Sequence, residues 1–197
     1  MALLVDEAIW PWQGRRWAHL VSDSHLVELH DLAHRIGLPY LAFQGDHYDV
    51  HEDLRAAAIA AGAVPTPGRD LVRALRAAGL RRRGTPSWQW VARRPVGGAS
   101  AAATALDELA TLGAPLAVEG LDRLAVALEP LAEIDEVGRA ERQGEVILVA
   151  SSTIRHERVV AGIEVLSPSA SVHLTAGERG TFAELVVVAP TSSRAAV

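Results

Sequence analysis

The chain has 197 residues, a formal net charge of −5 at pH 7, 49% hydrophobic residues and 22% charged residues. This balance excludes a disordered chain, because it supplies enough apolar side chains for one large domain or two small ones. The absence of cysteine excludes disulfides and thiolate metal sites, so a metal ion would need His, Asp or Glu ligands. Because no apolar run approaches the ~20 residues that cross a bilayer, and the first residues lack a secretion signal, we expect a cytoplasmic protein without a membrane partner.

The first part of the chain alternates short apolar runs with helical patterns. In chain order, these patterns predict a strand over residues 2–6, a loop over 10–17, an extended segment over 17–21, a helix from about 26 to 37, a strand over 38–43, a helix over 52–61, an extended segment over 63–66 and a helix over 67–78. The first strand delivers Asp6 to its carboxyl end, and Ser22, Asp23 or Ser24 can cap the first helix. The alternation predicts an α/β domain over residues 1–94 with some parallel strands.

A Gly-, Pro- and Arg-rich stretch from about residue 80 to residue 101 predicts an exposed, basic linker. Beyond it, residues 101–190 predict an acidic α+β region of a different character. It has helical patterns at 101–112 and 119–133, β-like runs from Glu145 onward, a hairpin turn at 177–182 and a frayed tail at 191–197. The fold class expected is therefore α/β, with a small alternating strand and helix domain followed by a second α+β region.

Several segments of the first part resemble one bacterial and phage family. The early LVD, the block WAHLVSDSHLVELHDLAHRIG, the short GDHYDV and the following AAGAVP are similar to the family catalogued as domain of unknown function 4031. The resemblance covers about residues 1–90, slightly less than half of the chain, and it implies no activity. The polar positions that it implies are Asp6, His19, Asp23, His30, His47, Tyr48 and Asp49. All 19 basic side chains other than His are Arg, which is also typical of a GC-rich bacterial genome.

Most residues with chemical potential are concentrated before residue 55. Six of the eight His lie in one short stretch among several carboxylates, namely His19, His25, His30, His34, His47 and His51. Imidazole and carboxylate groups are the ligands that a divalent metal would use in a chain without cysteine, and they are the usual general acids and bases near neutral pH. The opposing interpretation is a set of surface side chains with no joint role.

The segment Asp46-His47-Tyr48-Asp49 is the most informative part of this stretch. If it continues a strand, alternation places His47 and Asp49 on one side and Asp46 and Tyr48 on the other. Ligands in open α/β sheets collect at the carboxyl ends of strands, where Asp6 also lies. A loop held by Asp and Tyr hydrogen bonds is the structural alternative.

Two further patterns compete with this cluster. His30 and His34 are four residues apart on one helix face and resemble a zinc-binding helix motif, although Asp31 stands where the motif has its longer Glu base. Arginines, including Arg15 and Arg16, are interleaved with tryptophans, a composition that can grip phosphates and stack bases. The acidic flanks argue against broad nucleic-acid affinity, but they do not eliminate it.

The working hypothesis is a metal-assisted hydrolase that acts on a phosphate ester or nucleotide. Its divalent metal would be held by Asp6, His19, His47 and Asp49, its catalytic groups would be His19, Asp23, His47, Tyr48 and Asp49, and Arg15 and Arg16 would bind a small phosphate-containing molecule. The alternative from another class is a non-catalytic regulatory module that binds a ligand, a nucleic acid or a protein. Convergence of the carboxylates and His in one cleft favours the enzyme, whereas scattered placement favours the module.

Overall fold

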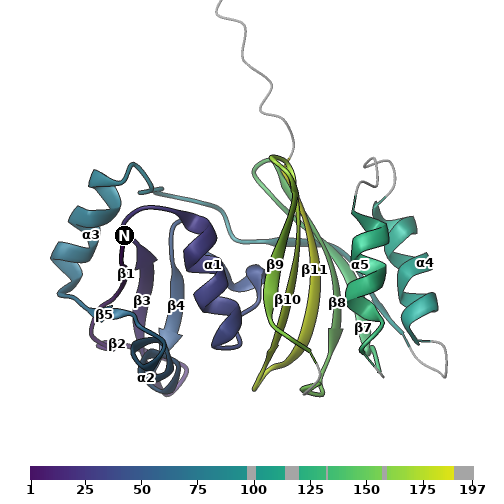
Figure 1. Cartoon of the computed structure of the whole chain (residues 1–197), viewed down its shortest axis with the longest axis horizontal. Coiled ribbons are helices and arrows are strands. Elements are labelled where there is room, and N and C mark those ends of the chain that lie inside the picture. Colours follow the sequence, from purple (N-terminus) through teal and green to yellow (C-terminus); the bar gives the residue numbers. More distant parts are fainter. Residues whose placement is uncertain (97–100, 114–119, 132, 157–158, 189–197) are drawn as a thin grey trace, which may run out of the picture. The chain divides into compact units, whose positions relative to one another are not determined.

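The computed structural model describes residues 1–96, 101–113, 120–131, 133–156 and 159–188 (Figure 1). Within these residues the chain forms five α-helices and two β-sheets, of five and six strands, which confirms the α/β fold class. The chain divides into two compact units, Met1–Thr85 and Pro86–Val197. None of the helices described is both long enough and apolar enough to cross a membrane.

The first unit is built around one central strand, β3. Its strands are β1 (Leu3–Val5), β2 (Trp10–Trp12), β3 (Arg15–Ser22), β4 (Tyr48–His51) and β5 (Val64–Pro65), and its helices are α1 (Leu26–Arg35), the short 3-10 helix η1 (Tyr40–Ala42), α2 (Glu52–Ala60) and α3 (Gly68–Ala77). β1 and β2 pair antiparallel with successive parts of one side of β3, while β4 pairs antiparallel with its other side. Only the β1–β5 pairing is parallel among the pairs described in this unit. β3 therefore brings three strands together.

The strand that borders β3 on the β1 and β2 side is interrupted directly after Val5. At this point the backbone N–H of Asp6 donates to the carbonyl of His19 at 3.2 Å, and the backbone N–H of His19 donates to the Asp6 carboxylate at 2.6 Å. A side-chain oxygen thus replaces the carbonyl that a continuous ladder would have supplied. The interruption fixes the Asp6 carboxylate against β3.

Two helices cover opposite faces of this sheet (Figure 1). On one face, Leu71 and Leu75 of α3 pack against Leu4 and Val21. On the other face, His30 of α1 contacts the buried Tyr48, which is paired with Leu20. Because side chains alternate along β3, His19 belongs to the face that α3 covers.

Two expectations for this unit were wrong. Residues 10–17 form a β-hairpin instead of a loop, because Gln13 and Gly14 adopt positive φ values of 48° and 74°, the conformation of a tight hairpin turn. Residues 38–43 do not form a strand. Pro39 precedes the η1 turn, and the extended segment begins only at Tyr48.

The second unit is an antiparallel sheet with two helices. Its elements are β6 (Gln89–Pro95), α4 (Ala101–Gly113), α5 (Leu121–Leu128), β7 (Glu136–Arg142), β8 (Glu145–Ser152), β9 (Gly162–Ser167), β10 (Ala170–Gly177) and β11 (Gly180–Val188). The strand order is β6-β7-β8-β11-β10-β9. Leu109 of α4 and Leu124 of α5 join Leu148 and Leu185 of the sheet in one buried core.

The stretch expected to be a linker contributes β6 to this sheet, where it pairs with β7. The hairpin turn expected at 177–182 is confirmed, since β10 and β11 meet through paired Gly177 and Gly180. The frayed tail expected at 191–197 lies outside the described residues.

Candidate metal centre

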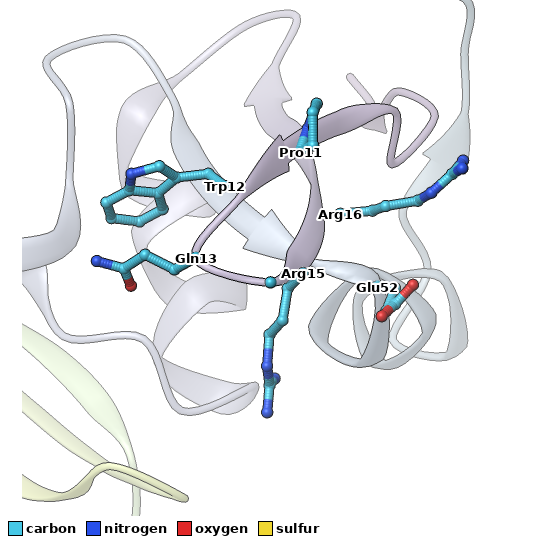
Figure 2. Close-up of a pocket in the computed structure, with 7 residues that line it drawn as sticks. Pro11, Trp12, Gln13, Arg15, Arg16 and Glu52 are labelled. Atoms are coloured by element: carbon cyan, nitrogen blue, oxygen red, sulfur yellow. The ribbon is translucent and has the colours of Figure 1, made fainter.

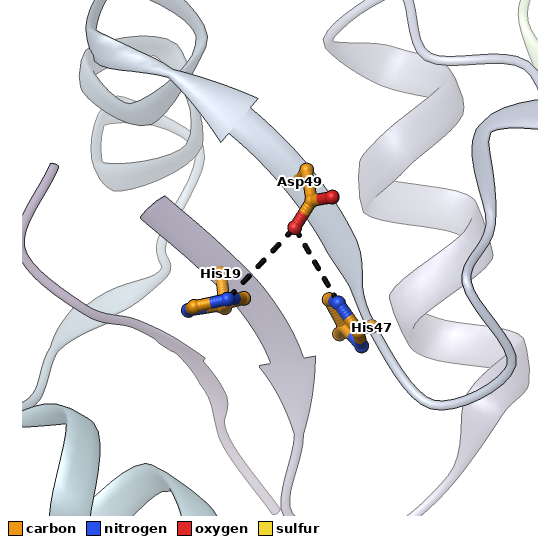
Figure 3. Close-up of side chains that lie close together, drawn as sticks. All are labelled: His19, His47 and Asp49. Carbon is orange, nitrogen blue, oxygen red and sulfur yellow. Dashed lines mark ion pairs between the residues drawn. The ribbon is translucent and has the colours of Figure 1, made fainter. Parts of the chain in front are cut away.

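Three side chains meet where β3 and β4 lie side by side (Figure 3). His19 of β3 is directly paired with Asp49 of β4, and His47 lies just before β4 begins. The Nε2 atoms of His19 and His47 lie 4.0 Å and 3.4 Å from the same oxygen of Asp49. The two imidazole ring centres are 5.2 Å apart. The alternation expected for His47 and Asp49 therefore holds.

Each imidazole is held from behind by a buried carboxylate. Nδ1 of His19 lies 2.9 Å from the Asp6 carboxylate, and Nδ1 of His47 lies 2.6 Å from the Asp46 carboxylate. The Asp6 and Asp46 side chains are only 9% and 1% exposed, whereas the Asp49 side chain is 46% exposed. Metal-binding histidines characteristically use one ring nitrogen for the ion and the other for such a carboxylate. The arrangement leaves both Nε2 atoms directed toward Asp49.

Asp46 is itself firmly anchored. Its second carboxylate oxygen accepts hydrogen bonds from the Arg81 side chain at 2.8 Å and from the Arg82 backbone N–H at 2.7 Å. Burial alone raises the pKa of Asp46, but the hydrogen bonds from His47, Arg82 and Arg81 outweigh it and hold the pKa below its usual value. Asp46 is therefore a fixed negative charge beneath His47.

This charge changes the proton affinity of His47. Burial alone lowers the pKa of His47, but its contacts with Asp46 and Asp49 outweigh burial and raise the pKa to about 9. Without a metal ion, the imidazole is therefore protonated at neutral pH. A cation is already favoured at this position, whether it is a proton or a metal ion.

Asp6 is anchored by helices as well as by β3. The Arg55 side chain of α2 donates to the Asp6 carbonyl at 2.6 Å. Gly68, the first residue of α3, lies so close that a Cβ atom there would be 3.3 Å from the Asp6 carboxylate. The positive end of the α3 dipole thus lies beside this carboxylate.

The cluster opens into a cleft of about 470 Å³. Asp6, His19 and His47 line it, together with apolar side chains of α3 and with Trp10. Three arginines also line it, namely Arg69, Arg76 and Arg81. Arg69 and Arg76 are seven residues apart, so they project from the same face of α3. The sequence interpretation missed both, although this spacing was available as a signal.

The donor set fits a divalent transition metal. One ligand atom from each of His19, His47 and Asp49 can be chosen so that all three lie within 4.8 Å of one another. An ion with bonds of ~2.1 Å in tetrahedral geometry holds its ligand atoms roughly 3.4 Å apart, so the ligands need to move inward by about 1 Å. Two imidazoles and one carboxylate leave other coordination positions for water or substrate.

The structure does not bring two of the expected catalytic residues to this cluster. Asp23 lies beyond the far end of β3, where it accepts a hydrogen bond from the Ala2 N–H at 2.7 Å and lies 4.0 Å from the terminal amine of Met1. Tyr48 is fully buried on the opposite face of the sheet, and its hydroxyl lies 2.8 Å from Nδ1 of His30. Asp6, expected as a metal ligand, instead orients His19 through both of its oxygens.

The expected phosphate-binding pair is also elsewhere. Arg15 and Arg16 line a separate open hollow of about 530 Å³ at the β2–β3 turn, and their side chains leave the hairpin in different directions (Figure 2). Nη1 of Arg15 lies 3.0 Å from Nδ1 of His51 and 3.6 Å from the Asp53 carboxylate. The two guanidinium groups therefore do not converge on one phosphate.

The His30 and His34 pair does not form a zinc motif. Both side chains are buried in α1, with His30 against Tyr48 and Nδ1 of His34 2.8 Å from the carbonyl of Leu38. Burial lowers the pKa of His34, although the Leu38 carbonyl and Asp31 oppose this shift. Both histidines have structural roles on the far side of the sheet from Asp49.

The first unit is thus an α/β domain with two histidines and one carboxylate gathered at an arginine-lined cleft. Residues 3–78 match the model of the family described as "Protein of unknown function (DUF4031)". This match confirms the family resemblance expected from the sequence, and the rest of the chain is unmatched. The chain has no significant match among curated proteins or solved structures.

Proposed function

We propose that the first unit binds a divalent metal ion through His19, His47 and Asp49 and hydrolyses a phosphate ester or nucleotide. One observation carries this proposal: the Nδ1 atoms of both histidines are held by buried carboxylates, while their Nε2 atoms face a shared third carboxylate. Surface histidines without a joint role have no need of such support.

The donor chemistry favours some ions over others. Imidazole ligands suit Zn²⁺ and other transition metals, whereas Mg²⁺ and Ca²⁺ prefer sites made of oxygen atoms. Asp6 and Asp46 add negative charge directly behind the two histidines, which increases the attraction for a cation. We expect Zn²⁺ or Mn²⁺ to bind more tightly than Mg²⁺.

The arginines of α3 favour a substrate that carries phosphate. Arg69 and Arg76 line the same cleft as His19 and His47, and their guanidinium groups can neutralise phosphate oxygens. Arg81 also lines the cleft, but its charge is already paired with Asp46. Without a metal ion and these arginines, the carboxylates of the cluster would repel a phosphate group.

The reaction requires activation of water and of the phosphorus centre. A divalent ion bound here would lower the pKa of a bound water and polarise a phosphoryl oxygen. Hydrolysis then forms a P–O bond from water to phosphorus, breaks the P–O bond to the leaving oxygen, and transfers one proton to that oxygen. Asp6 and Asp46 fix the imidazole orientations during this step, while Arg69 and Arg76 stabilise the charge on phosphate.

Metal content tests the proposal first. Purified protein, His47→Ala and Asp49→Ala are each supplied with Zn²⁺ or Mn²⁺, freed of loosely bound ions, and measured by mass spectrometry, with the exposed His25→Ala as the matched control. We expect one ion per chain in the wild type and in His25→Ala, and substoichiometric metal in the other two variants. Equal metal content in all four proteins, or none in any, would overturn the metal site.

Turnover is tested on the metal-loaded protein with p-nitrophenyl phosphate and bis(p-nitrophenyl) phosphate, which report monoester and diester hydrolysis. We expect metal-dependent release of p-nitrophenol, at least tenfold slower in Arg69→Ala/Arg76→Ala. Stoichiometric metal without turnover of either ester, or of nucleotides, would instead identify a non-catalytic metal-dependent binding module.

A further inference from the structure

The β2–β3 hairpin carries three tryptophans beside the candidate metal centre. Trp10 and Trp12 are 56% and 59% exposed, although indole is among the largest apolar side chains. Exposure of two such groups on one short hairpin is unfavourable unless they contact a partner. The other two tryptophans of the chain are differently placed, because Arg142 stacks on Trp88 and Arg93 stacks on Trp90.

The tryptophans share a face with the metal centre. Trp10 is paired with Trp17 across the hairpin, and Trp17 and His19 point to the same side of β3 because they are two residues apart. The ring centres of Trp10 and His19 lie 6.2 Å apart, and Trp10 lines the same cleft as His19 and His47. Trp12 continues the row about 7 Å further along β2. A line of aromatic side chains therefore leads outward from the metal centre.

This row is held in place by its own contacts. The rings of Trp12 and Trp17 meet edge to face at 5.2 Å, and Nε1 of Trp17 donates to the carbonyl of Trp12 at 2.9 Å. Trp17 also meets His51 edge to face at 5.7 Å. These contacts restrict the side chains of the hairpin, which reduces the conformational entropy lost when a flat ligand stacks on the exposed indoles.

Side chains that can bind phosphate and side chains that can stack on bases thus line the same cleft. Arg69 and Arg76 line the cleft from α3, and Trp10 lines the same cleft from the hairpin. Positive side chains that follow a phosphate backbone, next to aromatic rings that stack bases, are the combination that binds single-stranded nucleic acid. A duplex hides its base faces, and a mononucleotide would require only one of the two exposed indoles.

We propose that the substrate of this site is single-stranded nucleic acid, with successive bases stacked on Trp10 and Trp12 and the scissile phosphate between the metal centre and the α3 arginines. This inference rests on the proposed function, because it names the substrate class of the same metal-dependent phosphodiester hydrolysis. The Trp row makes the polymer a better substrate than a small ester, which cannot span both elements.

Binding is measured by fluorescence anisotropy of a labelled twelve-residue oligothymidylate on metal-free protein, so that no cleavage occurs. We expect Trp10→Ala/Trp12→Ala to bind at least tenfold more weakly, Trp10→Phe/Trp12→Phe to restore most of the affinity, and Trp90→Ala to bind like the wild type. Arg69→Ala/Arg76→Ala should reduce the dependence of affinity on salt concentration. Thermal unfolding of each variant shows that it is folded at the assay temperature.

Hydrolysis of bis(p-nitrophenyl) phosphate separates this inference from the proposed function. We expect the Trp10→Ala/Trp12→Ala variant to lose at least tenfold more of its cleavage of the oligonucleotide than of its cleavage of this small ester. Absence of metal-dependent cleavage of either substrate contradicts the proposed function itself. Cleavage of the small ester together with no oligonucleotide binding, unchanged binding by the Ala variant, equal binding of duplex, or salt-insensitive binding would each overturn the nucleic-acid inference.

Discussion

The carboxylate of Asp46 lies 2.6 Å from Nδ1 of His47 and is 1% exposed. It fixes the ring so that Nε2 faces Asp49, and it supplies the charge that stabilises a cation there. The Asp46→Asn substitution keeps the size of the side chain but removes that charge. We expect the dissociation constant for Zn²⁺ to rise about 10–100-fold, measured by competition with a chromophoric chelator. Asp31→Asn, which removes a surface ion pair with Arg35 on helix α1, should leave it unchanged; an equal effect of both variants would refute the role of Asp46.

The titration of His47 gives a second prediction, for the metal-free protein. Its pKa is raised from an ordinary 6.5 to about 9 in the folded state. The resulting stabilisation is fully present below pH 6.5 and is lost as the pH rises through 9, and its size is on the order of 3 kcal/mol. Imidazole nitrogen NMR should show His47 protonated at pH 7, and the wild type should lose more stability than His47→Gln between pH 6 and pH 10. A midpoint near 6.5 would contradict this.

Metal uptake should be coupled to proton release. Because His47 is protonated at pH 7 and an imidazole must be neutral to bind a metal, binding of the ion has to displace that proton. We expect close to one proton per ion at pH 7 and progressively fewer above pH 9. Calorimetric titration with Zn²⁺ in two buffers of different ionisation enthalpy measures this number directly. Zero protons released at pH 7 would mean that the ion does not displace the His47 proton.

Removal of the Tyr48 hydroxyl tests its placement away from the cleft. Tyr48→Phe deletes the hydrogen bond to His30 inside the protein, so we expect a loss of roughly 1–2 kcal/mol in the free energy of unfolding. Metal content and ester hydrolysis should remain at wild-type levels. Loss of turnover in a folded, metal-loaded Tyr48→Phe protein would show that Tyr48 takes part in the reaction after all.

Two glycines of the second unit distinguish backbone strain from steric overlap. Gly144 and Gly180 both have positive φ, at 82° and 108°, but a Cβ atom at Gly180 would lie 2.0 Å from the carbonyl oxygen of Ser152, whereas Gly144 has open space. We expect Gly144→Ala to cost about 1–2 kcal/mol and Gly180→Ala considerably more, as measured by chemical denaturation. Similar losses would show that the sheet moves to accommodate the methyl group.

Much of this arrangement could be predicted from the pattern of the sequence. The alternation of His47 and Asp49 followed from strand geometry, and the apolar run before Asp6 correctly placed that carboxylate at the end of a strand. Asp46 did not follow this alternation, because it lies two residues before β4 begins and its carboxylate contacts Nδ1 of His47 instead of lying on the Tyr48 side.

The remainder depended on long-range pairing. Asp23 follows His19 by four residues, and because β3 continues through Ser22, at ~3.3 Å per residue Asp23 lies roughly 13 Å from His19. Arg69 and Arg76 belong to a helix whose packing face is determined by Leu4 and Val21, far away in the sequence. Neither result can be obtained from local propensity.

The hydrogen bonds that anchor the Asp46 carboxylate determine how short a fragment of this unit can be without losing part of the site. Arg81 and Arg82, which hold that carboxylate, lie beyond residue 78, where the match to the DUF4031 family ends, but within the compact unit that ends at Thr85. A fragment cut at the family boundary would retain both imidazoles and Asp49, yet it would leave Asp46 without the Arg81 guanidinium and the Arg82 backbone N–H. Transfer of the site to another protein, or its study in isolation, therefore requires the polypeptide through residue 85.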